Sequence, residues 1–262
     1  MRLRVCLLVA TAALSAPAQW IHYPTPGIPR TRDGKPNLAA AVPKAVDGKP
    51  DLTGLWQRVP NPHRRTTGLE QGPNLEDYMR PGETIPPMLP AAQALHRQRM
   101  ANSMADRPSG RCLPHSIPDQ MLIGEPMKLV QNPGLTLILY EEFARFRQIF
   151  TDGRPHPPVT EPAWLGYSTG KWEGDWFVVD TRGFNDKSWL DDSGRPHTEA
   201  LHTIERFRRR DFGHLDVEIT IDDPGAYTKA WSFPLQFQFL ADTEMIEDVC
   251  DNERDAAHAV AK

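Results

Sequence analysis

Two long stretches of alternating residues constrain the fold of this chain more than any other feature. In residues 215–221, four apolar side chains alternate with Asp216, Glu218 and Thr220. In residues 231–239, five apolar side chains occupy every second position. A period of two places successive side chains on opposite faces of a strand. Both stretches are therefore predicted to be half-buried strands with one face on a hydrophobic core.

Shorter segments extend this sheet. Further strands are predicted at residues 52–56, 135–140, 145–150, 164–168, 176–181 and 201–209, and several neighbours are joined by turn-like sequences. Seven or eight mostly hairpin-connected strands favour a sheet that curls on itself. We expect a mainly β, antiparallel domain that is either a lipocalin-like barrel or a sandwich. The pattern itself does not distinguish the two, because a strand with one buried face looks the same in both.

The N-terminal part of the chain differs in composition. Residues 19–90 are rich in proline and glycine and contain the sequence Asp-Gly-Lys-Pro twice, starting at Asp33 and at Asp47. Each copy predicts a turn followed by an extended piece, so we expect an extended arm that wraps the core or is partly disordered. From Pro90 to Met104 there is no internal glycine or proline, which predicts one helix with proline in its first turn. This helix and the β domain are expected to occupy residues 91–262.

The first residues have the pattern of an export signal. Residues 1–18 combine a basic start, an apolar run of about ten residues and small residues at a cleavage site. The run is shorter than the roughly twenty residues that span a bilayer, so we expect no membrane insertion after cleavage and a periplasmic or secreted location. Cleavage would remove Arg2 and Arg4 and change the net charge from −4 to −6. This charge argues against nucleic acid as a partner.

Two cysteines, Cys112 and Cys250, follow the predicted signal. In an oxidising compartment an even pair predicts one disulfide. It would close a loop of more than a hundred residues and stabilise the fold by about 4 kcal/mol on the chain-entropy model. The alternative, a nucleophilic Cys112, has no supporting sequence context.

The densest group of polar residues is the connection from Trp189 to His202. We predict that His197 acts as general acid or base, that Glu199 or Asp191 orients it, and that His202 is a second proton carrier. This pairing assumes that the chain after Pro196 is extended, so that His197 and Glu199 point to one side.

Two alternatives are open for the same connection. In the first, Asp191 caps a turn with Ser193 and Gly194, and the histidines form only structural hydrogen bonds. In the second, His197, Glu199 and His202 bind a metal ion, although their spacing matches no helical zinc signature.

Aromatic and basic residues elsewhere could bind a ligand. We predict Trp189 and Tyr140 as aromatic walls of a substrate site. Alternation places Arg147 and Arg145 on one face of their strand; inside a barrel they could bind a carboxylate or a sugar, whereas outside they would form a solvated, ion-paired face. His115, close to Cys112, is expected to be a buried histidine with satisfied hydrogen bonds.

The sequence contains no Gly-x-Ser-x-Gly elbow, phosphate loop or dinucleotide fingerprint, so serine-hydrolase, ATP and NAD chemistry are not favoured. We expect an exported enzyme without a cofactor, an acid/base lyase or hydrolase for a small polar, sugar-like molecule. The alternatives are a binding protein for a small ligand, with a cavity lined by residues 231–239, a metal-dependent enzyme, and an interaction module whose arm binds a partner.

Several motifs together resemble a large family of exported bacterial proteins of unassigned function. They are Tyr23-Pro-Thr-Pro-Gly-Ile-Pro, Asp47-Gly-Lys-Pro-Asp-Leu-Thr-Gly-Leu-Trp56, Arg111-Cys-Leu-Pro, Gln131-Asn-Pro-Gly-Leu, Gly166-Tyr-Ser-Thr-Gly-Lys-Trp-Glu-Gly-Asp175, Trp189-Leu-Asp and His202-Thr-Ile-Glu-Arg-Phe207. The resemblance extends over nearly the whole chain after the signal and implies export, but it carries no established activity and assigns no catalytic residue. The Gly54-Leu-Trp56 segment separately resembles the start of a lipocalin-like barrel.

Overall fold

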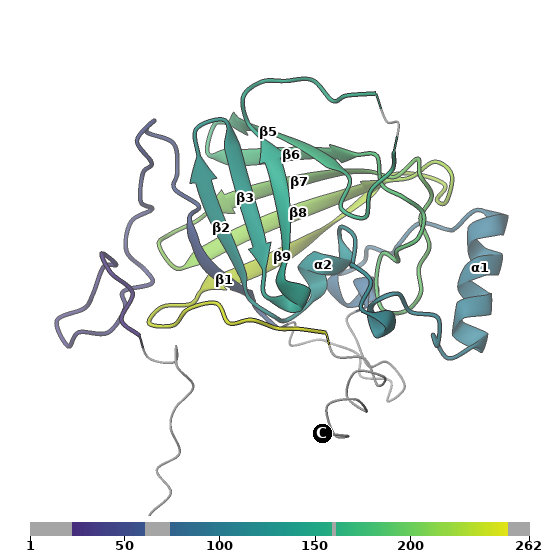
Figure 1. Ribbon diagram of the computed structural model, residues 1–262, viewed down its shortest axis with the longest axis horizontal. Coiled ribbons are helices and arrows are strands. Elements are labelled where there is room, and N and C mark those ends of the chain that lie inside the picture. The colour runs from purple at the N-terminus through teal and green to yellow at the C-terminus, as the bar shows by residue number, and fades with distance from the viewer. Residues whose placement is uncertain (1–22, 61–73, 159–160, 251–262) are drawn as a thin grey trace, which may run out of the picture.

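The computed structural model describes residues 23–60, 74–158 and 161–250, so the predicted signal peptide at residues 1–18 lies outside the described residues. Nine strands form a closed barrel in which each strand pairs with its neighbours in sequence (Figure 1). The strands are β1 (Gly54–Arg58), β2 (Met127–Asn132), β3 (Leu135–Tyr140), β4 (Arg145–Phe150), β5 (Tyr167–Glu173), β6 (Trp176–Arg182), β7 (His202–Arg209), β8 (His214–Asp222) and β9 (Trp231–Phe239). The prediction of a mainly β domain is confirmed, and of the two predicted architectures the structure is the barrel, not the sandwich.

Two features of the strand order differ from the prediction. β2 was not predicted as a strand; it forms a hairpin with β3 across the Asn-Pro-Gly turn, pairing Asn132 with Leu135. β4 and β5 are parallel, with Ile149 opposite Ser168, so the sheet is not antiparallel throughout. Parallel neighbours need a crossover. The described residues 151–158 and 161–166 belong to that connection.

The barrel closes at β1, which pairs with both β2 and β9. Trp56 lies opposite Met127 on one side and Phe239 on the other, and its side chain is completely buried. The indole N–H donates to the carbonyl oxygen of Leu52, which satisfies the one polar atom of this buried side chain. The last part of the proline-rich segment is therefore a structural strand of the barrel.

The alternating residues of β8 and β9 face inward as predicted. Their inward side chains form one core cluster with those of β1 and β2. Polar side chains share the interior with this cluster: inward-facing Arg147, Ser168, Thr181, Thr203 and Glu205 are all buried. The predicted solvated face is therefore wrong for Arg147, because β4 turns Arg147 and Ile149 inward and leaves Phe146 exposed.

The proline-rich arm packs on one end of the barrel. The Gly213 amide donates to the carbonyl of Leu38 at 2.7 Å, and Arg30 pairs with Asp242. Both Asp-Gly-Lys-Pro copies form the same turn, with φ of 81° at Gly34 and 79° at Gly48. Positive φ favours glycine, which explains this residue in both copies.

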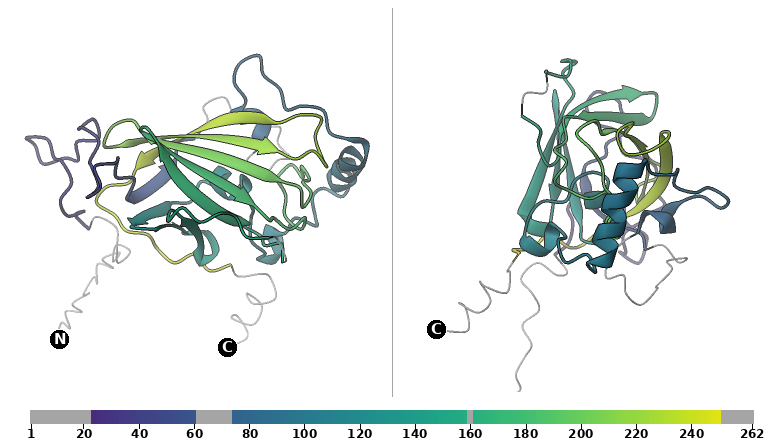
Figure 2. Two further views of the ribbon diagram at one scale, coloured as in Figure 1. Left: turned by 90° about the horizontal axis from the view of Figure 1, so that it is seen from above. Right: turned by 90° about the vertical axis from the view of Figure 1, so that its right-hand side faces the viewer.

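The predicted helix is α1 (Pro90–Ala101), and the short helix α2 (Asp119–Leu122) is an additional one. α1 ends before Met104 because Ser103 and Met104 adopt φ of 49° and 57°, outside the right-handed helical region. Short 3-10 turns occur at η1 (Leu75–Tyr78), η2 (Ser109–Arg111) and η3 (Glu142–Ala144). α1 lies at the end of the barrel opposite the arm (Figures 1 and 2). Among the described residues, no helix is long and apolar enough to cross a membrane.

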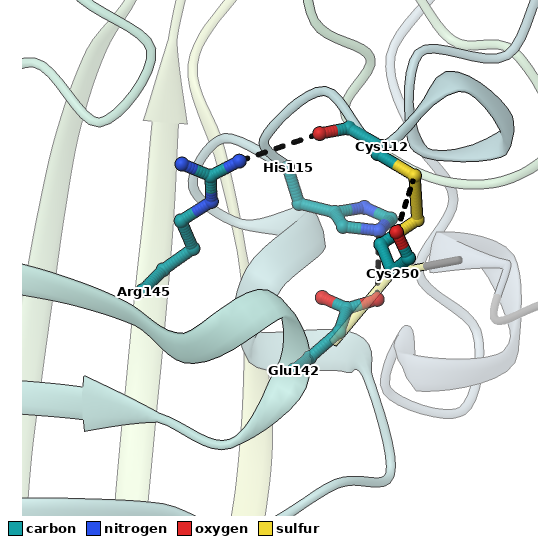
Figure 3. The surroundings of a disulfide bond; sticks show 5 residues. All are labelled: Cys112, His115, Glu142, Arg145 and Cys250. Carbon is teal, nitrogen blue, oxygen red and sulfur yellow. Dashed lines mark hydrogen bonds and ion pairs between the residues drawn. A yellow bond between two sulfur atoms is a disulfide. The ribbon is translucent and has the colours of Figure 1, made fainter. Parts of the chain in front are cut away.

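The predicted disulfide between Cys112 and Cys250 is confirmed. It links the segment before α2 to the chain that follows β9, across a sequence separation of 138 residues (Figure 3). The predicted nucleophilic alternative for Cys112 is excluded in this disulfide-bonded form, because a thiolate is required for nucleophilic attack.

Candidate active site

The connection between β6 and β7 holds most of the predicted catalytic residues, and Asp191 organises it. This carboxylate is completely buried. It accepts hydrogen bonds from the backbone and hydroxyl of Ser193, from Arg195 and from the Leu75 amide. Asp191 thus caps a turn, as the structural alternative predicts. The assignment of Asp191 as the carboxylate that orients His197 is not supported, because its hydrogen bonds go to other groups.

His197 instead pairs with Ser188. The Ser188 hydroxyl lies 2.7 Å from His197 Nε2, and His197 Nδ1 lies 3.2 Å from the carbonyl oxygen of Thr198. A carbonyl oxygen can only accept, so the ring proton belongs on Nδ1 and Nε2 accepts the serine proton. A hydroxyl donating to a histidine whose other nitrogen is oriented by an acceptor is the arrangement of a nucleophile with its general base.

The surroundings keep His197 neutral. His197 is only 4% exposed, and its ring packs edge-on against Phe184, with 6.3 Å between the two ring centroids. Burial lowers the pKa of His197, and the positive charge of Arg99 acts in the same direction, whereas the Thr198 carbonyl, Asp223 and Asp186 act against it. Neutral imidazole is the form that accepts a proton, so His197 is prepared to act as a base.

The predicted partners Glu199 and His202 do not join this pair. Glu199 is exposed, and His202 Nε2 lies 3.0 Å from Asp180 on the outer surface of the barrel. The chain after Pro196 is not extended, because the Leu201 amide donates back to the Thr198 carbonyl and Asp223 holds the amide and hydroxyl of Thr198.

The structure therefore does not pair His197 with Glu199, and among the described residues it does not group His197, Glu199 and His202 as possible metal ligands. The pairing of His197 with Glu199 assumed an extended chain after Pro196, which would have put both side chains on one side. A turn at Thr198 removes that alignment.

A cleft of about 380 Å³ lies beside the connection that carries Ser188, although neither Ser188 nor His197 lines it. Lys187 and Trp189, the residues on either side of Ser188, both line it. The other lining residues are Leu95, Gln98, Arg99, Asp106, Pro108 and Asp186. Trp189 was predicted as an aromatic wall and does line the cleft, whereas Tyr140 and Arg147 do not.

Arg99 brings a positive charge to this cleft. Its guanidinium lies 4.7 Å from the ring centroid of Trp189 and donates to the Gly194 carbonyl at 3.1 Å. Burial lowers the pKa of Arg99 to about 10, partly offset by Tyr227 and Asp186, so the group is charged at neutral pH. Within the part of the chain that the structure describes, Arg99 has no carboxylate at ion-pair distance. A bound anion could therefore pair with it.

Tyr140 and Arg147 belong to a network inside the barrel. Arg147 donates to both carboxylate oxygens of Glu205, to Ser168 and to Thr181. Burial raises the pKa of Tyr140 to about 12, and its hydroxyl lies 3.9 Å from the sulfur of Met121. Arg147 does bind a carboxylate, as one prediction proposed, but the carboxylate belongs to the protein.

A second group of ionisable residues lies beside the disulfide. His115 is buried, with Nδ1 2.5 Å from Asp119 and Nε2 3.0 Å from Glu142 (Figure 3). Burial opposes protonation, but the two carboxylates outweigh it and raise the pKa of His115 to about 10. The expectation of a buried, hydrogen-bonded histidine is confirmed. Asp192, from the β6–β7 connection, approaches the same group.

Sequence reasoning missed Ser188, although it immediately precedes Trp189. A search for the Gly-x-Ser-x-Gly elbow does not find a serine on a different loop. The available signal was a serine within ten residues of a histidine in a polar connection. No protein-family model and no curated protein matches this chain.

Proposed function

We propose that this protein is a hydrolase for esters of small polar organic molecules, such as acylated sugars, with Ser188 as the nucleophile and His197 as the general base. The observation that carries the proposal is the 2.7 Å hydrogen bond from the Ser188 hydroxyl to His197 Nε2, with Nδ1 oriented by the Thr198 carbonyl. The reaction needs no cofactor.

The chemistry follows from this geometry. His197 Nε2 takes the proton of Ser188 while the serine oxygen attacks the carbonyl carbon of the ester. His197 then gives the proton to the departing alkoxide as its bond to the carbonyl carbon breaks, so an alcohol leaves and the acyl group remains on Ser188 as an ester. In the second half, His197 takes a proton from water, the water oxygen attacks the acyl carbon, and Ser188 recovers its proton as the acid is released.

The cleft supports a small polar substrate. Its volume of about 380 Å³ falls in the range of small-molecule sites. Arg99 and Lys187 bring positive charge that stabilises the negative charge developing on the ester oxygen. Ser188 is only 1% exposed, so the side chains that cover it must move before a substrate reaches the hydroxyl.

Export is part of the proposal. The pattern of residues 1–18 indicates a signal peptide, and the disulfide is typical of proteins in an oxidising compartment. A periplasmic or secreted enzyme would meet small polar esters from outside the cytoplasm.

A fluorophosphonate probe and the chromogenic ester p-nitrophenyl acetate test the proposal on the mature, disulfide-bonded protein. We expect the probe to modify Ser188, as located by peptide mass spectrometry, and Ser188→Ala and His197→Gln to lower ester turnover by about 10³-fold or more. Ser232→Ala is the matched control, because it removes a hydroxyl that makes one hydrogen bond on the outer face of β9. Equal turnover by Ser188→Ala and the natural protein would refute the assignment.

Arg99, which has no carboxylate partner among the described residues, favours a second candidate, a non-enzymatic protein that binds a small anion in the same cleft. It predicts a thermal shift with organic acids that Arg99→Gln abolishes, together with no ester turnover and no probe labelling of Ser188.

A further inference from the structure

We infer that His115, Asp119 and Asp192 form a binding site for one divalent transition-metal cation such as Zn²⁺ or Mn²⁺. One possible ligand atom from each residue lies within 4.8 Å of those from the other two. The three residues come from two distant segments, the start of α2 and the β6–β7 connection. None of them belongs to the Ser188–His197 pair, so the inference is independent of the proposed esterase activity.

Asp119 has an oxygen that lacks a partner. Asp119 is only 4% exposed, and its Oδ1 makes no hydrogen bond to any described residue. A buried carboxylate oxygen without a partner is unfavourable, because burial removes its hydration without replacing it. The other oxygen, Oδ2, already faces His115 Nδ1. A cation bound by both oxygens of Asp119 would give Oδ1 the partner that the described residues do not supply.

The surroundings of His115 match those of metal-binding histidines. Its Nε2 faces Glu142 at 3.0 Å, and Gln120 donates to the second oxygen of Glu142 at 3.1 Å. A ligating histidine commonly donates its other ring N–H to a carboxylate, which fixes the ring and its tautomer. Glu142 thus leaves Nδ1, which faces Asp119, as the ligating atom.

The charges at this site favour a divalent cation. Asp119, Glu142 and Asp192 contribute three negative charges, and Arg107, 3.1 Å from Asp192, contributes one positive charge. With His115 neutral as a ligand, two negative charges remain. Imidazole with carboxylates suits Zn²⁺ or Mn²⁺ better than Ca²⁺, which takes oxygen ligands.

Binding requires a small local rearrangement. His115 Nδ1 and Asp119 Oδ2 are 2.5 Å apart, whereas two ligands about 2.0–2.2 Å from one tetrahedral metal stand roughly 3.3–3.6 Å from each other. The pair must therefore separate by about 1 Å as the cation replaces the proton between them. The disulfide restrains the segment that carries His115, because Cys112 lies only three residues before it and Arg145 donates to the Cys112 carbonyl (Figure 3).

The test uses the mature protein without a histidine tag, freed of metal by a chelator and with its disulfide intact. Isothermal titration with Zn²⁺ and with Mn²⁺ should show one site per chain, and elemental analysis after desalting should find one equivalent of the bound metal. We expect Asp192→Asn and Asp119→Asn each to weaken binding at least tenfold. His202→Gln is the control, because it removes a histidine from a different surface group around Asp180.

Asp192→Asn decides the test if Asp119→Asn does not fold, because the Asp192 side chain is 10% exposed at the edge of the site. Folding of each variant is checked by circular dichroism and by thermal unfolding without metal. Failure of the folded natural protein to bind either cation overturns the inference. Equal affinity of Asp192→Asn and the natural protein, with weaker binding by His202→Gln, also overturns it and assigns binding to the surface group.

Discussion

The substitution Glu205→Gln tests the buried ion pair inside the barrel. Glu205 is completely buried and Arg147 is 3% exposed, and the guanidinium donates to both oxygens of the carboxylate. Glutamine keeps the shape of the side chain but removes its charge. Arg147 would then be a buried cation without a counter-charge, which costs about 3–5 kcal/mol. For a domain of this size, each kcal/mol lowers Tm by about 2–4 °C, so we expect a decrease of about 6–20 °C.

Thermal unfolding of the disulfide-bonded protein by circular dichroism measures this effect. The matched control is Glu218→Gln on the neighbouring strand β8, where the pair with Arg80 at 2.9 Å is 38–39% exposed and should be worth at most about 1 kcal/mol. The double variant Arg147→Met/Glu205→Leu should recover most of the lost stability, because it removes both buried charges and leaves Ser168 and Thr181 hydrogen-bonded to each other. A Tm change for Glu205→Gln no larger than that for Glu218→Gln would refute the reasoning.

Two further predictions concern His197 of the candidate site and the arm. Burial lowers the folded-state pKa of His197 below the unfolded value near 6.5. The stability contributed by the neutral His197 should therefore be present above about pH 6.5 and be lost as pH falls toward the folded-state pKa. An NMR titration in which His197 protonates at or above pH 6.5 would contradict this. In Gly213→Ala, the new methyl would lie 2.4 Å from Leu38 Cβ and 2.9 Å from its backbone, so we expect the free energy of unfolding to fall by about 1–3 kcal/mol and the arm to be cleaved faster by protease. Gly110→Ala, whose methyl meets open space, should change neither quantity in the denaturant and protease assays.

Much of the barrel could be predicted because its signals are local. Alternation identifies β8 and β9 within single stretches of sequence, and the absence of glycine and proline identifies α1. The disulfide followed from the number of cysteines that remain after the predicted signal. Each of these inferences depends on one segment or on a count, and none requires knowing which distant segments meet.

The candidate site was only partly predictable for the same reason. The polar connection was recognised, and His197 and Trp189 were correctly placed in it. The partner of His197 was not, because an extended chain after Pro196 would pair it with Glu199, whereas the turn held by Asp223 directs Glu199 into solvent. Asp223 lies beyond β8, outside the stretch in which the pattern was read.

The sequence by itself determined the class of structure: a mainly β domain with inward apolar faces, one substantial helix and one disulfide. Only the tertiary structure decided that β1 closes a barrel, that Arg147 faces its interior opposite Glu205, that Ser188 meets His197, and that Asp192 approaches His115. The physical reason is that the periodicity of apolar residues indicates which side chains share one face of a strand. The environment of that face depends on the distant segments that pack against it.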